Sequence, residues 1–162
     1  MTDQSGQYFG EISKQELAER DALESRVSDL RGGLTALQEQ IDATRDYDGL
    51  AGLCVTCWSH LRSVDLVMHE LLVHDHERVG ELAPPSSEVI RECLAGGYAQ
   101  VKRVMAEEYD LEIGKKRLHL ASALALQGIE TLESRIDAMR DDERDQWAQV
   151  RRQGEFDRYG GS

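Results

Sequence analysis

The chain has 162 residues, of which 40% are hydrophobic and 31% charged, and its formal net charge is −12. This length suits one compact domain or one elongated helical assembly. The negative charge disfavours non-specific binding to nucleic acid or to an anionic membrane surface. Two prolines, 6% aromatic residues and many Ala, Leu, Glu and Arg residues favour helix over sheet.

Two further features concern the compartment. The first residues, MTDQSGQYFGEIS, lack the basic and apolar regions of an export signal, and no apolar run approaches the ~18 residues that span a bilayer. The three cysteines are odd in number, which favours a reducing compartment over a disulfide framework. We therefore expect a cytoplasmic protein that does not bind membranes.

A heptad pattern predicts a first helix from about residue 14 to 45. The stretch Ser13–Glu16 reads SKQE, a capping-box pattern that would start this helix and leave residues 1–12 as a flexible tail. Gly32 and Gly33 lie inside the helix and predict a kink or a break. The apolar residues are spaced four and three apart: Leu23, Val27, Leu30, Leu34, Leu37 and Ile41.

A second helix follows the turn sequence RDYDGLAG and ends near Gly80 and Pro84. Ser86 or Ser87 would cap a third helix, and Gly114 would mark the next turn. The alternative to two separate helices is one fused helix, because Val104, Leu111 and Leu118 are spaced seven residues apart. The predicted apolar faces are Leu50, Cys54, Cys57, Leu61, Val64, Met68 and Leu71, then Ile90, Cys93, Gly97, Val101 and Val104, then Leu118, Ala125, Ile129, Leu132, Ile136 and Met139.

One short sequence occurs twice with few changes. LESRVSDLR begins at Leu23 and LESRIDAMR begins at Leu132. Such an echo could mark duplicated helices, but the simpler interpretation is convergence on residues that suit a heptad pattern.

These elements together predict an all-α fold. Four long helices joined by short turns would form an up-down-up-down bundle or a pair of antiparallel coiled-coil hairpins. The helical domain would cover residues 13–153, followed by a flexible tail over 154–162. The narrow apolar seams of the first and fourth helices also favour association with a second copy of the chain.

The stretch from Cys54 to His74 resembles the Cys2His2 zinc fingers. Its spacing is C-x2-C-x11-H-x4-H, with Cys54, Cys57, His69 and His74 as the four ligands, and such a set completes the tetrahedral shell of zinc. The stretch departs from the family in having a short interval before His69 and an acidic character where DNA-reading fingers are basic. The resemblance implies a zinc-binding interaction module.

A continuous helix is the competing interpretation, and it excludes the finger. Cys54 and His69 would then be separated by roughly 22 Å along the helix axis, and Cys54 and Cys57 would be buried apolar positions. A third alternative places zinc between helices, with Cys54 and Cys57 from the second helix joined by His60 and His119. We favour the continuous helix, without a metal.

Other patterns for catalysis fail on spacing. The stretch HELLVH from His69 to His74 is one residue longer than the HExxH of zinc proteases, and CVTCW is not preceded by the strand that a redox CxxC motif follows. A metal-linked or redox-linked enzyme is therefore the least favoured reading. The sequence predicts a non-catalytic assembly or adaptor protein that binds protein partners, or copies of itself, through helix faces and tails.

Overall fold

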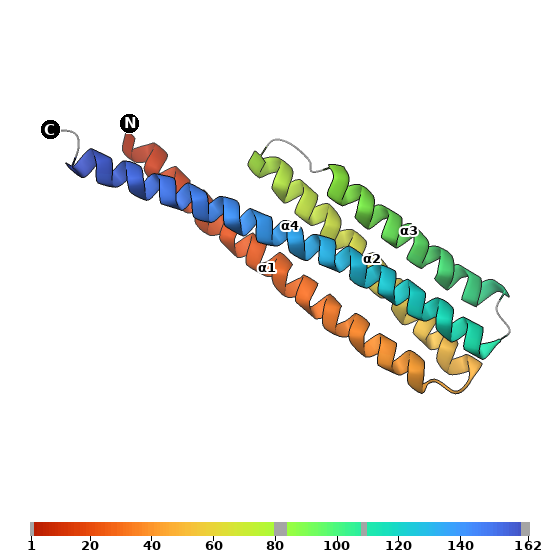
Figure 1. Cartoon of the computed structure of the whole chain (residues 1–162). Helices are drawn as coiled ribbons and strands as arrows, with labels where there is room; N and C mark the ends of the chain where they lie inside the picture. The colour runs from red at the N-terminus through yellow and green to blue at the C-terminus, as the bar shows by residue number, and fades with distance from the viewer. Residues whose placement is uncertain (1, 80–83, 108–109, 160–162) are drawn as a thin grey trace.

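The computed structural model describes residues 2–79, 84–107 and 110–159, and these residues form four helices and no strand (Figure 1). The helices are α1 (Thr2–Ala43), α2 (Tyr47–Val79), α3 (Pro84–Glu107) and α4 (Leu111–Tyr159). The predicted all-α fold is confirmed. Only the backbone is described at residues 2–13, 16–17, 72–79, 84–86, 107, 142–143, 146–147 and 155–159.

The helix α1 is longer and more regular than its sequence suggests. It begins at Thr2, before the capping-box pattern at Ser13, because no proline or other breaker forces the chain to leave the helix there. It also continues through Gly32 and Gly33 without the predicted break, since the seam residues on both sides are buried and offset the cost of two glycines. The flexibility of residues 1–12 and 154–162 stays a prediction.

Aspartates begin two of the helices. The Asp46 side chain accepts a hydrogen bond from the Gly49 amide at 2.7 Å and caps α2. Asp110 caps α4 in the same way, because its Oδ1 accepts a hydrogen bond from the Glu112 amide at 2.9 Å. The separate cap shows that α3 and α4 are not fused, and it places Gly114 inside the first turns of α4 rather than in the turn predicted there.

The predicted serine caps of the third helix are wrong. Ser86 and Ser87 lie within α3, which begins at Pro84. Proline suits the first turn of a helix because the amide hydrogen that it lacks has no partner inside the helix at that position. Pro84, which the sequence predicts to follow the end of the second helix, is therefore also the first residue of α3.

The heptad spacing predicts the core well. With the exception of Leu30, which is partly buried, the predicted apolar positions of all four helices are buried, and most form one cluster. Val67, Leu94 and Ala121 complete it. Burial of this set is the main stabilising contribution to the fold.

The arrangement of the helices follows from their contacts. Each helix packs against the next in sequence, α4 also packs against α1, and α2 contacts α4 across the middle. Neighbouring helices run in opposite directions, and α1 and α4 continue past α2 and α3 at the end where the two chain termini lie (Figure 1). None of the helices in the described ranges has an apolar stretch long enough to cross a membrane.

Candidate functional site

Cys54 and Cys57 lie on the buried side of α2. Their side chains are 1% and 0% exposed, as the continuous-helix interpretation requires. Burial raises the pKa of Cys54 to about 11 and that of Cys57 to about 12, and Cys54 adds to the shift at Cys57. Both thiols are therefore protonated at neutral pH, whereas a zinc ligand or a nucleophile is a thiolate. Here they act as small apolar side chains.

The structure does not bring the predicted zinc-finger ligands together. Because α2 is continuous from Tyr47 to Val79, Cys54 and His69 lie roughly 22 Å apart along its axis. The exposed His69 ring instead lies 3.4 Å from Asp65 on its own helix. His74 lies in the part of α2 where only the backbone is described.

The alternative ligands His60 and His119 also lie apart. The ring of His60 lies against Gly33 of α1, and His119 Nε2 lies 2.7 Å from Asp42 Oδ1. Gly33 and Asp42 are separated by roughly 13 Å along α1. The side chains that the structure describes include no group of three or more His, Cys, Asp or Glu residues arranged to hold a metal ion. The absence of a cofactor stays our prediction, with zinc as its alternative.

Two glycines allow α2 to approach its neighbours closely. A Cβ atom built on Gly33 would lie 2.8 Å from Cε1 of His60, and one built on Gly97 of α3 would lie 2.7 Å from Cδ2 of Leu61. The consecutive α2 residues His60 and Leu61 therefore each pack against a glycine, one on α1 and the other on α3.

Burial lowers the pKa of His60, because the ring is partly removed from water beside α1.

The C-terminal end of α1 is closed by side chains of α4. Lys115 Nζ donates hydrogen bonds to the carbonyl oxygens of Asp42 and Thr44, both at 3.1 Å. His119 contacts the Asp42 carboxylate one turn further along. Lys115 therefore satisfies carbonyls that the helix end leaves without partners, and His119 adds a side-chain contact beside them.

The two copies of the echoed sequence pack against each other. Arg31, the last residue of the first copy, donates to Glu133, the second residue of the other copy, through Nε at 2.9 Å. Arg140 forms the reciprocal ion pair with Glu24. The two copies of the repeated sequence therefore form a locally twofold-symmetric contact that fixes the register of α1 against α4. Each copy has Glu as its second residue and Arg as its ninth, and this pattern was the signal that sequence analysis missed.

Aromatic side chains of α2 and α3 also pack against each other between these two helices. The rings of Trp58 and Tyr98 are 4.5 Å apart between centroids, and Lys102 Nζ lies 5.9 Å from the Trp58 ring. This cluster links the two helices by ring contact and a cation–π interaction.

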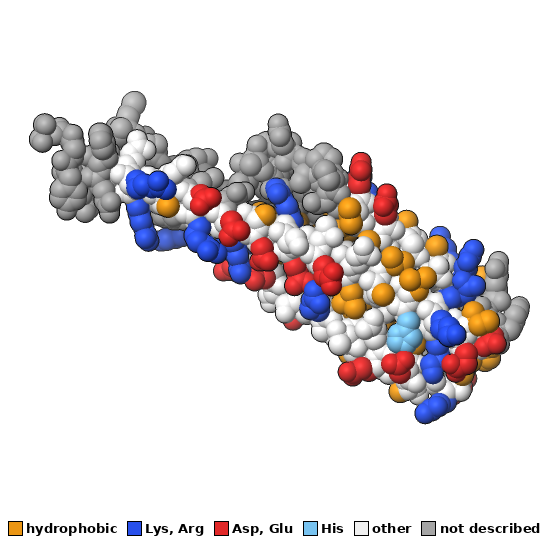
Figure 2. All heavy atoms as spheres, in the orientation of Figure 1, with side chains coloured by type: hydrophobic (Ala, Val, Ile, Leu, Met, Phe, Trp, Pro, Cys, Tyr) orange, Lys and Arg blue, Asp and Glu red, His pale blue; other side chains and the backbone are white. Residues whose placement is uncertain are grey.

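Exposed apolar side chains gather where α3 packs on α4. Gly96 of α3 lies opposite Leu124 of α4, whose Cδ1 would be 3.0 Å from a Cβ on that glycine. On either side of this point along the two helices, Val89 is 40% exposed, Ile113 44% and Leu120 47%. We call the surface formed by these five residues the α3/α4 face. In Figure 2, apolar side chains gather over α3 and α4 on this side of the molecule.

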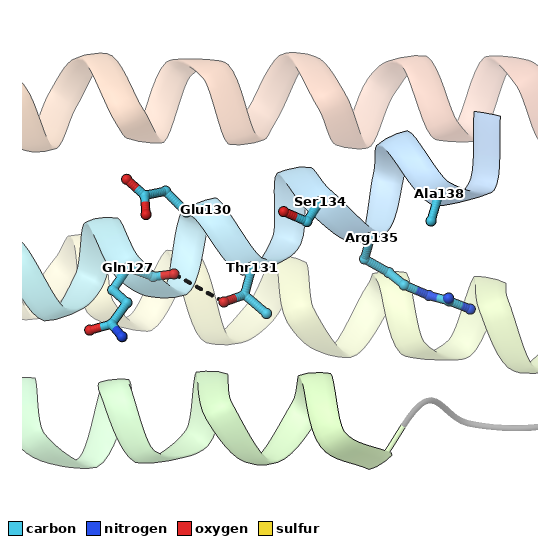
Figure 3. Close-up of a pocket in the computed structure, with 6 residues that line it drawn as sticks. All are labelled: Gln127, Glu130, Thr131, Ser134, Arg135 and Ala138. Atoms are coloured by element: carbon cyan, nitrogen blue, oxygen red, sulfur yellow. Dashed lines mark hydrogen bonds between the residues drawn. The ribbon is translucent and has the colours of Figure 1, made fainter. Parts of the chain in front are cut away.

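A groove of about 500 Å³ continues the α3/α4 face along α4. Val89 lies seven residues before Gly96, and Thr131 lies seven residues after Leu124, so Val89 of α3 is at the same level along the bundle as Thr131 of the groove. Thr131 donates a hydrogen bond to the Gln127 carbonyl at 3.1 Å, and in Figure 3 both side chains lie on the α3 side of α4. The lining residues are Gln127, Glu130, Thr131, Ser134, Arg135 and Ala138.

Four exposed charges beside the α3/α4 face differ in sign between its two ends; Arg91 and Arg135 at the acidic end and Glu112 at the basic end are exceptions to this pattern. Glu88 and Glu92 lie toward the start of α3, at the groove end, whereas Arg103 and Lys116 lie toward the turn into α4. All four side chains are exposed, and no ion pair among the described residues involves them. In Figure 2, basic and acidic side chains both lie near the turn into α4.

Comparison with known proteins gives no relative: no family model, no curated protein and no solved structure matches the chain.

Proposed function

We propose that this chain is a non-catalytic helical assembly or adaptor protein, a structural component of a larger complex. Its four helices form an up-down-up-down bundle, and the bundle presents the α3/α4 face to a protein partner. The coiled-coil-like seam of α1 with α4 holds the bundle together, supported by the reciprocal ion pairs of the echoed sequence.

The observation that carries this proposal is the apolar surface beside the groove. Ile113 and Leu120 stand seven residues apart on one side of α4 and are both close to half exposed. Contiguous exposed apolar side chains rimmed by charges are typical of protein interaction sites. A binding surface made of helix faces needs no reactive group, which agrees with the protonated state of Cys54 and Cys57.

The class of partner follows from charge and chemistry. A net charge of −12 favours a protein partner, or another copy of the chain, over nucleic acid or an anionic membrane. The three free, buried thiols support a cytoplasmic, reducing location.

The test compares two leucines of similar exposure on different faces. Leu120 lies on the α3/α4 face, and Leu66, which is 53% exposed, lies on α2. Tagged wild type, Leu120→Arg and Leu66→Arg are expressed in the native cell, and the associated chains are quantified by mass spectrometry. We expect Leu120→Arg to lose the associated chains and Leu66→Arg to keep them. Equal recovery with all three proteins would contradict the proposal.

A further inference from the structure

The α3/α4 face is complementary to itself. Its centre is the contact of Gly96 with Leu124. Measured from that centre, Glu88 lies eight residues toward the groove end of α3, and Arg103 lies seven residues the other way. These spacings correspond to roughly 12 Å and 10 Å along the helix. A rotation of 180° about an axis across both helices therefore brings Glu88 of one copy beside Arg103 of the other.

The same rotation matches shape as well as charge. Ile113 lies eleven residues from Leu124 toward the turn, and Arg135, in the groove, lies eleven residues from it in the opposite direction. The rotation thus carries Ile113 of one copy to the groove of the other. Leu120 is carried to the level of Gln127 and Gly128, near the groove entrance. Ile113 and Leu120 project from the half of the face near the turn into α4, whereas the groove and Val89 lie on the other half.

We propose that the α3/α4 face binds a second copy of this chain, in a twofold dimer in which α3 packs antiparallel on α3 and α4 antiparallel on α4. This inference rests on the proposed assembly function and names its partner. The interface is isologous, so every apolar and charged contact occurs twice.

The size of the face suits a stable dimer. The 24 residues of α3 span roughly 36 Å, and two helices side by side are about 20 Å wide. The whole outer surface of α3 and the adjoining part of α4, at whose centre the α3/α4 face lies, therefore offers up to about 700 Å² per copy, close to the ~800 Å² per partner of a standard interface. The acidic and basic ends supply two sets of complementary rim charges, which select the antiparallel orientation.

The first experiment is sedimentation velocity over a wide range of protein concentration. We expect the wild type to form a dimer, Leu120→Arg to be monomeric, and Leu66→Arg to remain dimeric. The far-ultraviolet circular dichroism spectra of the three proteins should agree, because both leucines are about half exposed and their replacement leaves the helices intact. A wild type that stays monomeric at every concentration, or a dimer that survives Leu120→Arg, overturns the proposal.

The second experiment uses paired charge reversals. Arg103→Glu and Glu88→Lys should each weaken the dimer at least tenfold, since like charges then face each other twice. A mixture of the two variants should form a mixed dimer of near wild-type affinity, because opposite charges face each other at both places. Failure of the mixture to associate, where each variant alone is monomeric, overturns the twofold arrangement.

Cross-linking locates the axis. Ala123 is exposed beside the centre of the face, and Ala36 is exposed on α1. We expect Ala123→Cys to be joined to its counterpart in the second copy by a short bis-maleimide, and Ala36→Cys and the wild type to remain unlinked. Equal linking of both variants contradicts the assignment. If the chain is monomeric and another protein binds through Leu120, the assembly function stands and this inference fails.

Discussion

The two adjacent glycines of α1 provide a matched test of how α2 packs. A Cβ atom on Gly32 would meet nothing within 4 Å, whereas one on Gly33 would lie 2.8 Å from the ring of His60. Alanine is favoured over glycine in a helix by about 1 kcal/mol. Gly32→Ala should therefore stabilise the protein by up to about 1 kcal/mol, which raises the melting temperature by roughly 2–4 °C.

Gly33→Ala gains the same helix propensity but must displace the imidazole. The atom to be displaced ends a partly exposed side chain, so the cost should lie at the low end of the ~1–3 kcal/mol of overpacking, and the net change should be close to zero. The two alanine variants should thus differ by about 1 kcal/mol although the positions are neighbours on one helix.

Urea unfolding of both variants, in the wild type and in a His60→Ala background, measures this difference. Removal of the ring should make Gly33→Ala as favourable as Gly32→Ala, because the close contact no longer exists. The difference between the backgrounds is the coupling energy of Gly33 and His60. The reasoning is refuted if Gly33→Ala already stabilises the wild type as much as Gly32→Ala does.

Three further predictions concern the core and the α1–α4 pairing. Glu24→Arg should destabilise the protein by no more than about 1 kcal/mol, because the ion pair is partly exposed, and addition of Arg140→Glu should restore stability in thermal melts. Burial lowers the pKa of His60 in the folded protein, so the neutral ring adds to stability above the ordinary pKa of ~6.5. This stability is lost as the pH falls from there toward the folded pKa. His60→Gln should therefore lose less stability than the wild type between about pH 7 and 5 in urea unfolding. Cys57→Ala should lower the free energy of unfolding by roughly 0.5–3 kcal/mol, and a chelator should leave the wild-type melting temperature unchanged. Close to one zinc per chain on elemental analysis would contradict the interpretation of Cys57 as a packing residue.

The core was predictable because one rule governs it. Apolar side chains repeated every three or four residues must share one side of a helix, so Leu34, Leu61 and Ile129 are buried wherever the neighbouring helices lie. The same rule identified Cys54 and Cys57 as buried positions. Helix ends were harder to predict, since a cap such as Ser13 is used only if the chain before it leaves the helix.

The α3/α4 face could not be found from the sequence. Val89, Ile113 and Leu120 fall outside the heptad positions, and each one alone resembles an ordinary exposed apolar residue. They form one surface only because α3 packs on α4 with Gly96 opposite Leu124. The contact of Asp42 with His119 joins residues 77 apart and likewise depends on the packing of α1 on α4.

The measurement that tests the central claim most directly is the oligomeric state of the full chain with Leu120 or Leu66 replaced by arginine. These residues are equally large and similarly exposed, so they differ chiefly in the face that they occupy. We predict a dimer for the wild type and for Leu66→Arg, and a folded monomer for Leu120→Arg. A dimer in all three proteins, or its loss in both variants, would contradict the account.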